Sequence, residues 1–116
     1  MKGSRHSATR HWRNQRLTAI ALVPLGLWFL VALLRQPALD YATVLGWLGK
    51  PLQALLAALF GGVMLWHSLQ GVQIVLEDYA HGRALRVSLT LSQFLHGAAA
   101  LVLAWAVFTI ATGGAR

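Results

Sequence analysis

The chain of 116 residues is 57% hydrophobic and only 11% charged, and its 10 Lys and Arg against 3 Asp and Glu give a net charge of +7. A soluble domain of this size could not bury so much apolar surface, so the composition excludes an ordinary globular fold. Because the chain has no cysteine, it cannot form disulfides, use a thiolate as nucleophile or hold an iron–sulfur cluster through thiolates.

The chain begins with a basic arm, residues 1–16, that contains no acidic residue. Its cationic residues are Lys2, Arg5, Arg10, Arg13 and Arg16. A signal peptide would have a shorter apolar core than the run that follows, and no small-residue cleavage site stands out. We therefore expect a cytoplasmic arm that sets topology and touches anionic membrane lipid, and we expect no nucleic-acid partner.

Three long runs without charged residues follow the arm, at 17–34, 52–76 and 87–111. About 20 helical residues cross a hydrocarbon layer of about 30 Å, and each run approaches or exceeds that length. The short alternating segments of a β-barrel do not occur. The sequence thus predicts an all-α membrane protein, one membrane anchor domain over residues 1–116 with three transmembrane helices.

The remaining segments are an external loop, 35–51, and a cytoplasmic loop, 77–86. Lys and Arg are more frequent in the arm and the second loop than in the first loop and the C-terminus, which places the N-terminus inside and the C-terminus outside. Pro24 should kink the first helix. Pro51 suits the first turn of the second helix, and Gly82 is expected to stop it.

The second predicted helix carries polar residues deep in an apolar run. At about 100° per residue, His67 and Asp78 share one face, about 16 Å apart along the axis. The polar flank beside that face consists of Gln70, Gln73 and Glu77. Such side chains are costly in lipid, so we expect them to face protein, a cofactor or water.

His67 has two readings that the residues alone leave open. A neutral imidazole can bind haem iron, and Gly71, one turn on, leaves space for a flat macrocycle. Zinc is less suitable because the region offers few other ligands. The alternative is a histidine hydrogen-bonded to a neighbouring helix. His96 in the third helix is predicted at similar depth, so one chain could clamp a haem between His67 and His96, or His96 could bond across the bundle.

Asp78 and Tyr79 lie at the end of the second predicted helix, where the lipid headgroups of the membrane are expected. They could be a solvated helix end and an interfacial anchor. They could also form a site for a lipophilic quinone, in which a phenol donates a hydrogen bond to a carbonyl and titratable groups exchange protons.

Two segments of the sequence resemble a known protein family, which gives more information than helical periodicity alone. "HSLQGVQIVLEDY" (67–79) resembles the H-x₃-G-x₆-D-Y pattern of the small hydrophobic membrane anchor subunit of succinate dehydrogenase, respiratory complex II. "HWRNQRLTAIALVPL" (11–25) is similar to the same family, especially its α-proteobacterial and mitochondrial-like branch. The resemblance extends over nearly the whole chain.

The resemblance implies half of a two-subunit anchor bundle in the bacterial cytoplasmic (inner) membrane, with the C-terminus periplasmic. A second membrane anchor (cytochrome b) subunit, an iron–sulfur subunit and a flavoprotein subunit are the implied partners. Haem b would lie between the anchors, with His67 as one axial ligand and Arg16 near a propionate. Tyr79 and Asp78 would contact ubiquinone. The chain itself would contribute no catalytic residue to succinate chemistry.

The implied function is electron transfer from succinate oxidation to quinone in the respiratory chain and tricarboxylic acid cycle. The enzyme would be the assembled complex, and the status of the chain alone stays open. Two other hypotheses remain at this point. One is a self-contained b-type cytochrome that uses His67 and His96, and the other is a structural membrane scaffold without a cofactor.

Overall fold

The computed structural model describes residues 2–115, and side chains from Ser7 onward. Within this range the chain is entirely helical apart from short connections. Its helices are α1 (Lys2–Leu34), α2 (Tyr41–Leu48), α3 (Pro51–Tyr79) and α4 (Gly82–Ala111). Three segments are long and apolar enough to cross a membrane: Ser7–Leu34, Pro51–Tyr79 and Gly82–Ala111. The predicted all-α membrane fold is confirmed.

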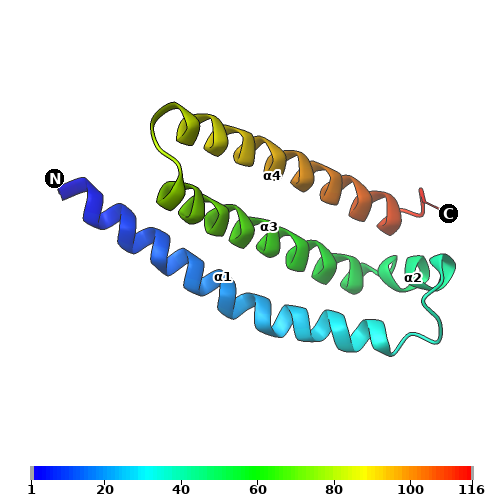
Figure 1. Ribbon diagram of the computed structural model, residues 1–116. Coiled ribbons are helices and arrows are strands. Elements are labelled where there is room, and N and C mark those ends of the chain that lie inside the picture. The colour runs from blue at the N-terminus through cyan, green and yellow to red at the C-terminus, as the bar shows by residue number, and fades with distance from the viewer. Residues whose placement is uncertain (1, 116) are drawn as a thin grey trace.

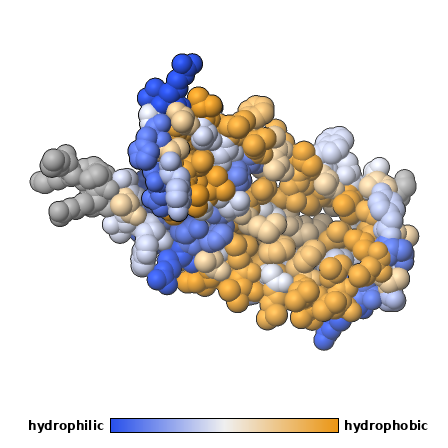
Figure 2. All heavy atoms as spheres, in the orientation of Figure 1, coloured by the Kyte–Doolittle hydropathy of each residue, from blue (hydrophilic) through white to orange (hydrophobic). Residues whose placement is uncertain are grey.

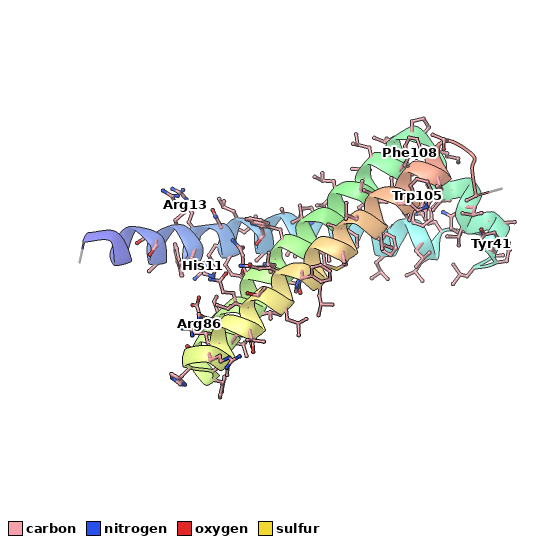
Figure 3. The ribbon with its side chains drawn as sticks, turned by 90° about the horizontal axis from the view of Figure 1, so that it is seen from above. His11, Arg13, Tyr41, Arg86, Trp105 and Phe108 are labelled. Carbon is pink, nitrogen blue, oxygen red and sulfur yellow. The ribbon has the colours of Figure 1, made fainter. Side chains whose placement is uncertain are left out.

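The three long helices lie side by side, with α3 between α1 and α4 (Figure 1). The N-terminus and the turn from α3 to α4 lie at one end, which we call the basic end because it carries the arginines of the arm and of the turn. The opposite end, which holds α2 and the C-terminus, is called the α2 end. Figure 3 shows the first turns of α1 diverging from α3 and α4. This divergence opens a space between α1 and α3 at the basic end.

Most large apolar side chains lie on the outside of the bundle. Among the described residues, the only buried hydrophobic side chains are Trp47 and Ala54, each with 6% of its surface exposed. Figure 2 shows a broad apolar belt between two hydrophilic ends. Such a surface is stable when lipid or another apolar protein covers it, because exposing so large an apolar patch to water is unfavourable.

Aromatic side chains join the helices near the α2 end. The rings of Phe29 and Phe60 lie 5.3 Å apart, and those of Phe29 and Trp47 lie 5.8 Å apart. The indole N–H of Trp47 donates to Gln53 Oε1 at 3.2 Å, which satisfies the polar group of this buried ring. The cluster ties α1, α2 and α3 together.

The start of α2 is fixed by Asp40. Its carboxylate accepts hydrogen bonds from the Thr43 backbone N–H and from the Thr43 hydroxyl, both at 2.9 Å. These bonds hold the pKa of Asp40 below its usual value, and the backbone bond has the largest effect. The connection between the first two spans, predicted as a loop over 35–51, therefore contains a capped helix that the sequence analysis does not predict.

The helix ends differ from the sequence expectations in two places and agree with them in a third. The arm is helical and continuous with the first span, because α1 begins at Lys2 and runs through Pro24 without a break. Pro51 stands in the first turn of α3, as predicted. The expectation that Gly82 stops the second long helix was wrong, because α3 already ends at Tyr79. Gly82 is the first residue of α4 and has a φ of 58°. Glycine accepts this left-handed conformation at the turn without strain.

Candidate functional site

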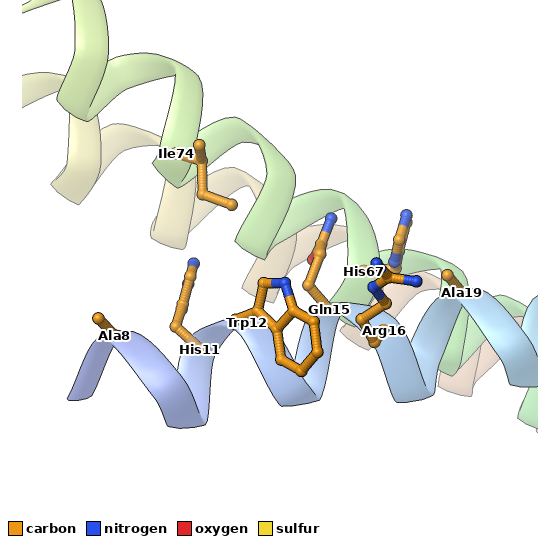
Figure 4. A pocket seen from close by; sticks show the side chains of 8 residues that line it. All are labelled: Ala8, His11, Trp12, Gln15, Arg16, Ala19, His67 and Ile74. Carbon is orange, nitrogen blue, oxygen red and sulfur yellow. The ribbon is translucent and has the colours of Figure 1, made fainter. Parts of the chain in front are cut away.

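An open groove lies between the first half of α1 and the middle of α3. We call it the α1–α3 groove. Its volume is about 410 Å³, and its walls are almost wholly apolar. It is lined by Ala8, His11, Trp12, Gln15, Arg16 and Ala19 from α1, and by His67 and Ile74 from α3 (Figure 4). His67 and Arg16, which lie 51 positions apart in the sequence, thus share one cavity.

His67 is held by one hydrogen bond. Its Nδ1 lies 2.8 Å from the hydroxyl oxygen of Thr18 on α1, and among the described residues the imidazole makes no other hydrogen bond. The second ring nitrogen, Nε2, is therefore left without a protein partner. Histidines that ligate metals typically use one nitrogen for the metal while a second group holds the other nitrogen. This arrangement can supply one ligand to a metal centre.

Arg16 lies over the ring of Trp12, with its guanidinium carbon 5.1 Å from the ring centroid. The attraction of a cation to the face of an indole ring favours this placement. A guanidinium is always charged and pairs with carboxylates through two parallel hydrogen bonds. Arg16 is the one arginine or lysine among the described residues that line the groove, and it therefore brings a permanent positive charge there.

Among the described residues, three side-chain atoms of α1 and α3 are buried without a hydrogen-bond partner: His11 Nε2, Gln15 Oε1 and Gln70 Oε1. Gln70 is only 5% exposed. Buried polar groups are normally paired, so unpaired groups of this kind mark a place where water or a bound group completes the structure. Of the polar flank predicted to face away from lipid, Gln70 is buried, Gln73 is half-buried and Glu77 is exposed.

Gly71 does not leave the open space expected from the sequence. A Cβ at this position would lie 3.5 Å from Nε2 of Gln15. The amide of Gln15 thus already occupies the place beside Gly71. A side chain as small as alanine would make ordinary contact with that amide.

The structure does not bring His96 to His67. His96 Nδ1 donates to the backbone oxygen of Ser92 at 2.8 Å, and its Nε2 lies 3.1 Å from the hydroxyl of Ser68 on α3. His96 therefore stands at the depth of His67, as expected, but it lies between α3 and α4 while His67 contacts α1. Both its nitrogens are engaged, so the across-bundle reading describes His96.

Asp78 and Tyr79 lie at the end of α3, at the basic end of the bundle. Tyr79 is 84% exposed, Asp78 is also exposed, and neither side chain forms a hydrogen bond within residues 7–115. Glu77 differs because Gln73 donates to its carboxylate at 2.8 Å. The phenol and the carboxylate are thus free to contact a ligand or a partner, whereas Glu77 is already engaged.

Thr18 is the residue of this region that the sequence analysis misses. It stands at the second position of the first apolar run, where a hydroxyl is the only visible signal. Its partner His67 is 49 positions away. Only the relative axial position of two helices brings them together.

The chain matches, over residues 2–112, the family described as succinate dehydrogenase/fumarate reductase transmembrane subunit. It is 31% identical over 112 residues to a succinate dehydrogenase hydrophobic membrane anchor subunit of Paracoccus denitrificans, an alignment that covers 97% of this chain and 84% of that protein. It is 33% identical over 90 residues to the protein of the same name from Rickettsia bellii (strain RML369-C), with 78% and 72% covered.

A third relative is a succinate dehydrogenase membrane anchor subunit of Reclinomonas americana, 31% identical over 85 residues, with 70% of each protein covered. No solved structure matches the chain. The family match spans nearly the whole chain, and the three long apolar helices agree with its transmembrane description. The chain therefore belongs to the succinate dehydrogenase/fumarate reductase transmembrane subunit family, within which it is similar to the hydrophobic membrane anchor subunits of succinate dehydrogenase.

Proposed function

We propose that this anchor subunit holds one side of a haem b and completes the ubiquinone-reduction site of a succinate:quinone oxidoreductase. One observation carries the proposal: an imidazole with a free nitrogen and a guanidinium line the same apolar groove. These are the side chains that haem requires, one for the iron and one for a propionate.

His67 would bind the haem iron through Nε2, and Arg16 would pair with a propionate. The haem, when bound, supplies reversible one-electron transfer. His67 and Arg16 would fix its orientation, and the apolar walls of the α1–α3 groove would keep water from its edge. The second ligand would come from the partner anchor subunit, because both nitrogens of His96, the other histidine at this depth, are already engaged.

Tyr79 and Asp78 would complete the quinone site. Reduction of ubiquinone to ubiquinol takes up two electrons and two protons, which succinate oxidation to fumarate releases. Tyr79 would donate its phenolic hydrogen bond to a quinone carbonyl, and Asp78 would exchange protons with water at the membrane surface. Their exposure and lack of internal partners support this role.

The partners follow from what the chain lacks and what it exposes. Without cysteine, it cannot carry the iron–sulfur clusters that would deliver electrons, so an iron–sulfur subunit must approach the basic end. A flavoprotein subunit would oxidise succinate. The second anchor subunit would cover part of the apolar belt and close the α1–α3 groove, while lipid would cover the remainder.

The orientation follows from charge. The arginines of the arm and of the α3–α4 turn gather at the basic end, so this end would face the cytoplasm of a bacterial cell and the C-terminus would face the periplasm. The succinate-oxidising subunits would then dock on the cytoplasmic side, at the end where Tyr79 and Asp78 lie.

Co-purification tests this function. The tagged chain, extracted from its native membrane in mild detergent, should bring a flavoprotein, an iron–sulfur protein, a second hydrophobic subunit and a b-type haem absorbance. The complex should reduce ubiquinone with succinate. Isolation of the chain without these subunits and without a haem band from membranes that oxidise succinate would overturn the proposal.

A further inference from the structure

We propose that Thr18 is a positioning residue that fixes the protonation and rotation of the His67 imidazole, so that Nε2 is presented to the α1–α3 groove as a ligand. This inference rests on the proposed haem ligation. It goes further because it assigns a role to a residue of the first span.

The argument begins with the proton of the Thr18 hydroxyl. The hydroxyl oxygen lies 2.9 Å from the backbone oxygen of Asn14, 3.1 Å from that of Gln15 and 2.8 Å from His67 Nδ1. A hydroxyl has one proton to donate and two lone pairs to accept with. A carbonyl oxygen can only accept, so donation to Asn14 or Gln15 leaves a Thr18 lone pair directed at His67.

His67 Nδ1 must then carry the proton and donate to Thr18. In the opposite arrangement Thr18 would donate to Nδ1, and the imidazole proton would sit on Nε2. That N–H would be a donor without a partner in a groove with almost wholly apolar walls. Unpaired donors are rarer in proteins than under-used acceptors, so the first arrangement is favoured.

The favoured arrangement is also the one a metal needs. With the proton on Nδ1, the lone pair of Nε2 is free to bind iron, and the hydrogen bond to Thr18 stops the ring from rotating. A hydrogen bond from Nδ1 also makes the imidazole a stronger donor to the metal. Stronger donation favours the ferric state of a haem, so it lowers the reduction potential.

The chain offers a matched control in Thr109. Its hydroxyl donates in the same way to backbone oxygens one turn earlier, to Trp105 at 3.0 Å and to Ala106 at 2.9 Å. Like Thr18 it is half-buried in a long helix. It differs in having no side-chain partner among the described residues. Thr109→Val therefore controls for the loss of a helical threonine hydroxyl that bonds to its own backbone, without loss of a bond to a histidine.

The experiment uses the assembled complex in mild detergent, with haem content and haem midpoint potential as readouts. Thr18→Val should weaken haem retention by about 10- to 100-fold, the usual effect of removing a group that holds a metal-bound histidine. The haem that remains should have a higher potential than in the wild type. Thr18→Ser, which keeps the hydroxyl, and Thr109→Val should both resemble the wild type.

Failure of this inference is distinct from failure of the proposed function. If His67→Ala removes haem while Thr18→Val changes neither retention nor potential, Thr18 has no positioning role and the inference is wrong. If His67→Ala leaves the haem unchanged, the ligand assignment itself is wrong. Should Thr18→Val fail to assemble, Thr18→Cys replaces it. The thiol is a weaker acceptor of similar size, and an unchanged potential in that variant overturns the inference.

Discussion

Ser68 on α3 and His96 on α4 are joined across the helix interface, with the serine hydroxyl 3.1 Å from His96 Nε2. Because His96 Nδ1 is bonded to Ser92 as well, the histidine crosslinks two helices and leaves no nitrogen free. This finding separates the histidine of α3, His67, from the histidine of α4, His96, by role. His96 contributes to packing, and His67 is the one with a free nitrogen.

His96→Ala should therefore lower stability without removing haem. Loss of a hydrogen bond between transmembrane helices costs about 1 kcal/mol, and the thermal midpoint of the complex in detergent should fall by a few degrees. The haem spectrum should be unchanged. A haem that disappears in His96→Ala while the subunits stay assembled would instead favour the self-contained cytochrome.

Tyr79→Phe should lower ubiquinone reduction about tenfold, the effect expected from about 1.4 kcal/mol when one hydrogen bond to a carbonyl is lost. Succinate oxidation with a soluble artificial acceptor should persist, since the flavoprotein is untouched. The matched control is Tyr41→Phe, another exposed tyrosine, whose hydroxyl donates to Ala115 at the α2 end.

Two results would contradict the role of Tyr79. One is an equal loss of quinone reduction and artificial-acceptor activity, which would indicate damage to the whole complex. The other is an equal loss of ubiquinone reduction in Tyr41→Phe, which would show that any exposed phenol at a membrane surface has this effect.

Arg16→Gln should lower the haem midpoint potential. Reduction adds one negative charge to the haem, and a nearby guanidinium stabilises that charge, so its removal favours the oxidised form. A partly exposed charge pair contributes up to about 1 kcal/mol, which corresponds to a shift of roughly 40 mV for one electron. A redox titration followed at the haem band measures it.

Arg13→Gln is the control for that titration. Arg13 is exposed on the same helix and points away from α3 and α4 in Figure 3, so the variant removes the same charge without altering the α1–α3 groove. Equal potentials in the Arg16 and Arg13 variants would show that Arg16 does not contact the haem.

Gly61→Val should destabilise the contact between α3 and α4. A Cβ at Gly61 would lie 2.7 Å from a methyl carbon of Leu103, so the side chain of Leu103 must move. Overpacking of this kind costs about 1–3 kcal/mol. The thermal midpoint of the complex should fall, and Leu103→Ala in the same chain should restore part of the loss.

Gly62→Val provides the comparison for Gly61. A Cβ at Gly62 has no neighbour within 4 Å, yet the helix-propensity change is the same. A fall in the thermal midpoint as large as that of Gly61→Val would mean that helix propensity or an unseen partner, and not Leu103, sets the cost.

The three spans could be predicted because lipid imposes a simple demand: about 20 apolar residues in a helix that satisfies its own backbone hydrogen bonds. The helix ends could not, because a helix does not stop at the edge of the apolar layer. Backbone hydrogen bonding continues into the basic arm and through Tyr79. The helix α2 was also missed, although Asp40 and Thr43 carry its capping signal.

The candidate site could be predicted only within one helix. Periodicity placed His67 on a polar face of the second span, and the family resemblance pointed to Arg16. The bond between His67 and Thr18 and the placement of Gln15 against Gly71 depend on how α1 slides and crosses relative to α3. No single-helix pattern contains that information.

The most direct test of the account is the reduced-minus-oxidised spectrum of the purified complex carrying His67→Ala, with His96→Ala as its counterpart. The account predicts that the b-type haem band is lost or strongly altered in the first variant and retained in the second. A haem band unchanged in His67→Ala would contradict it.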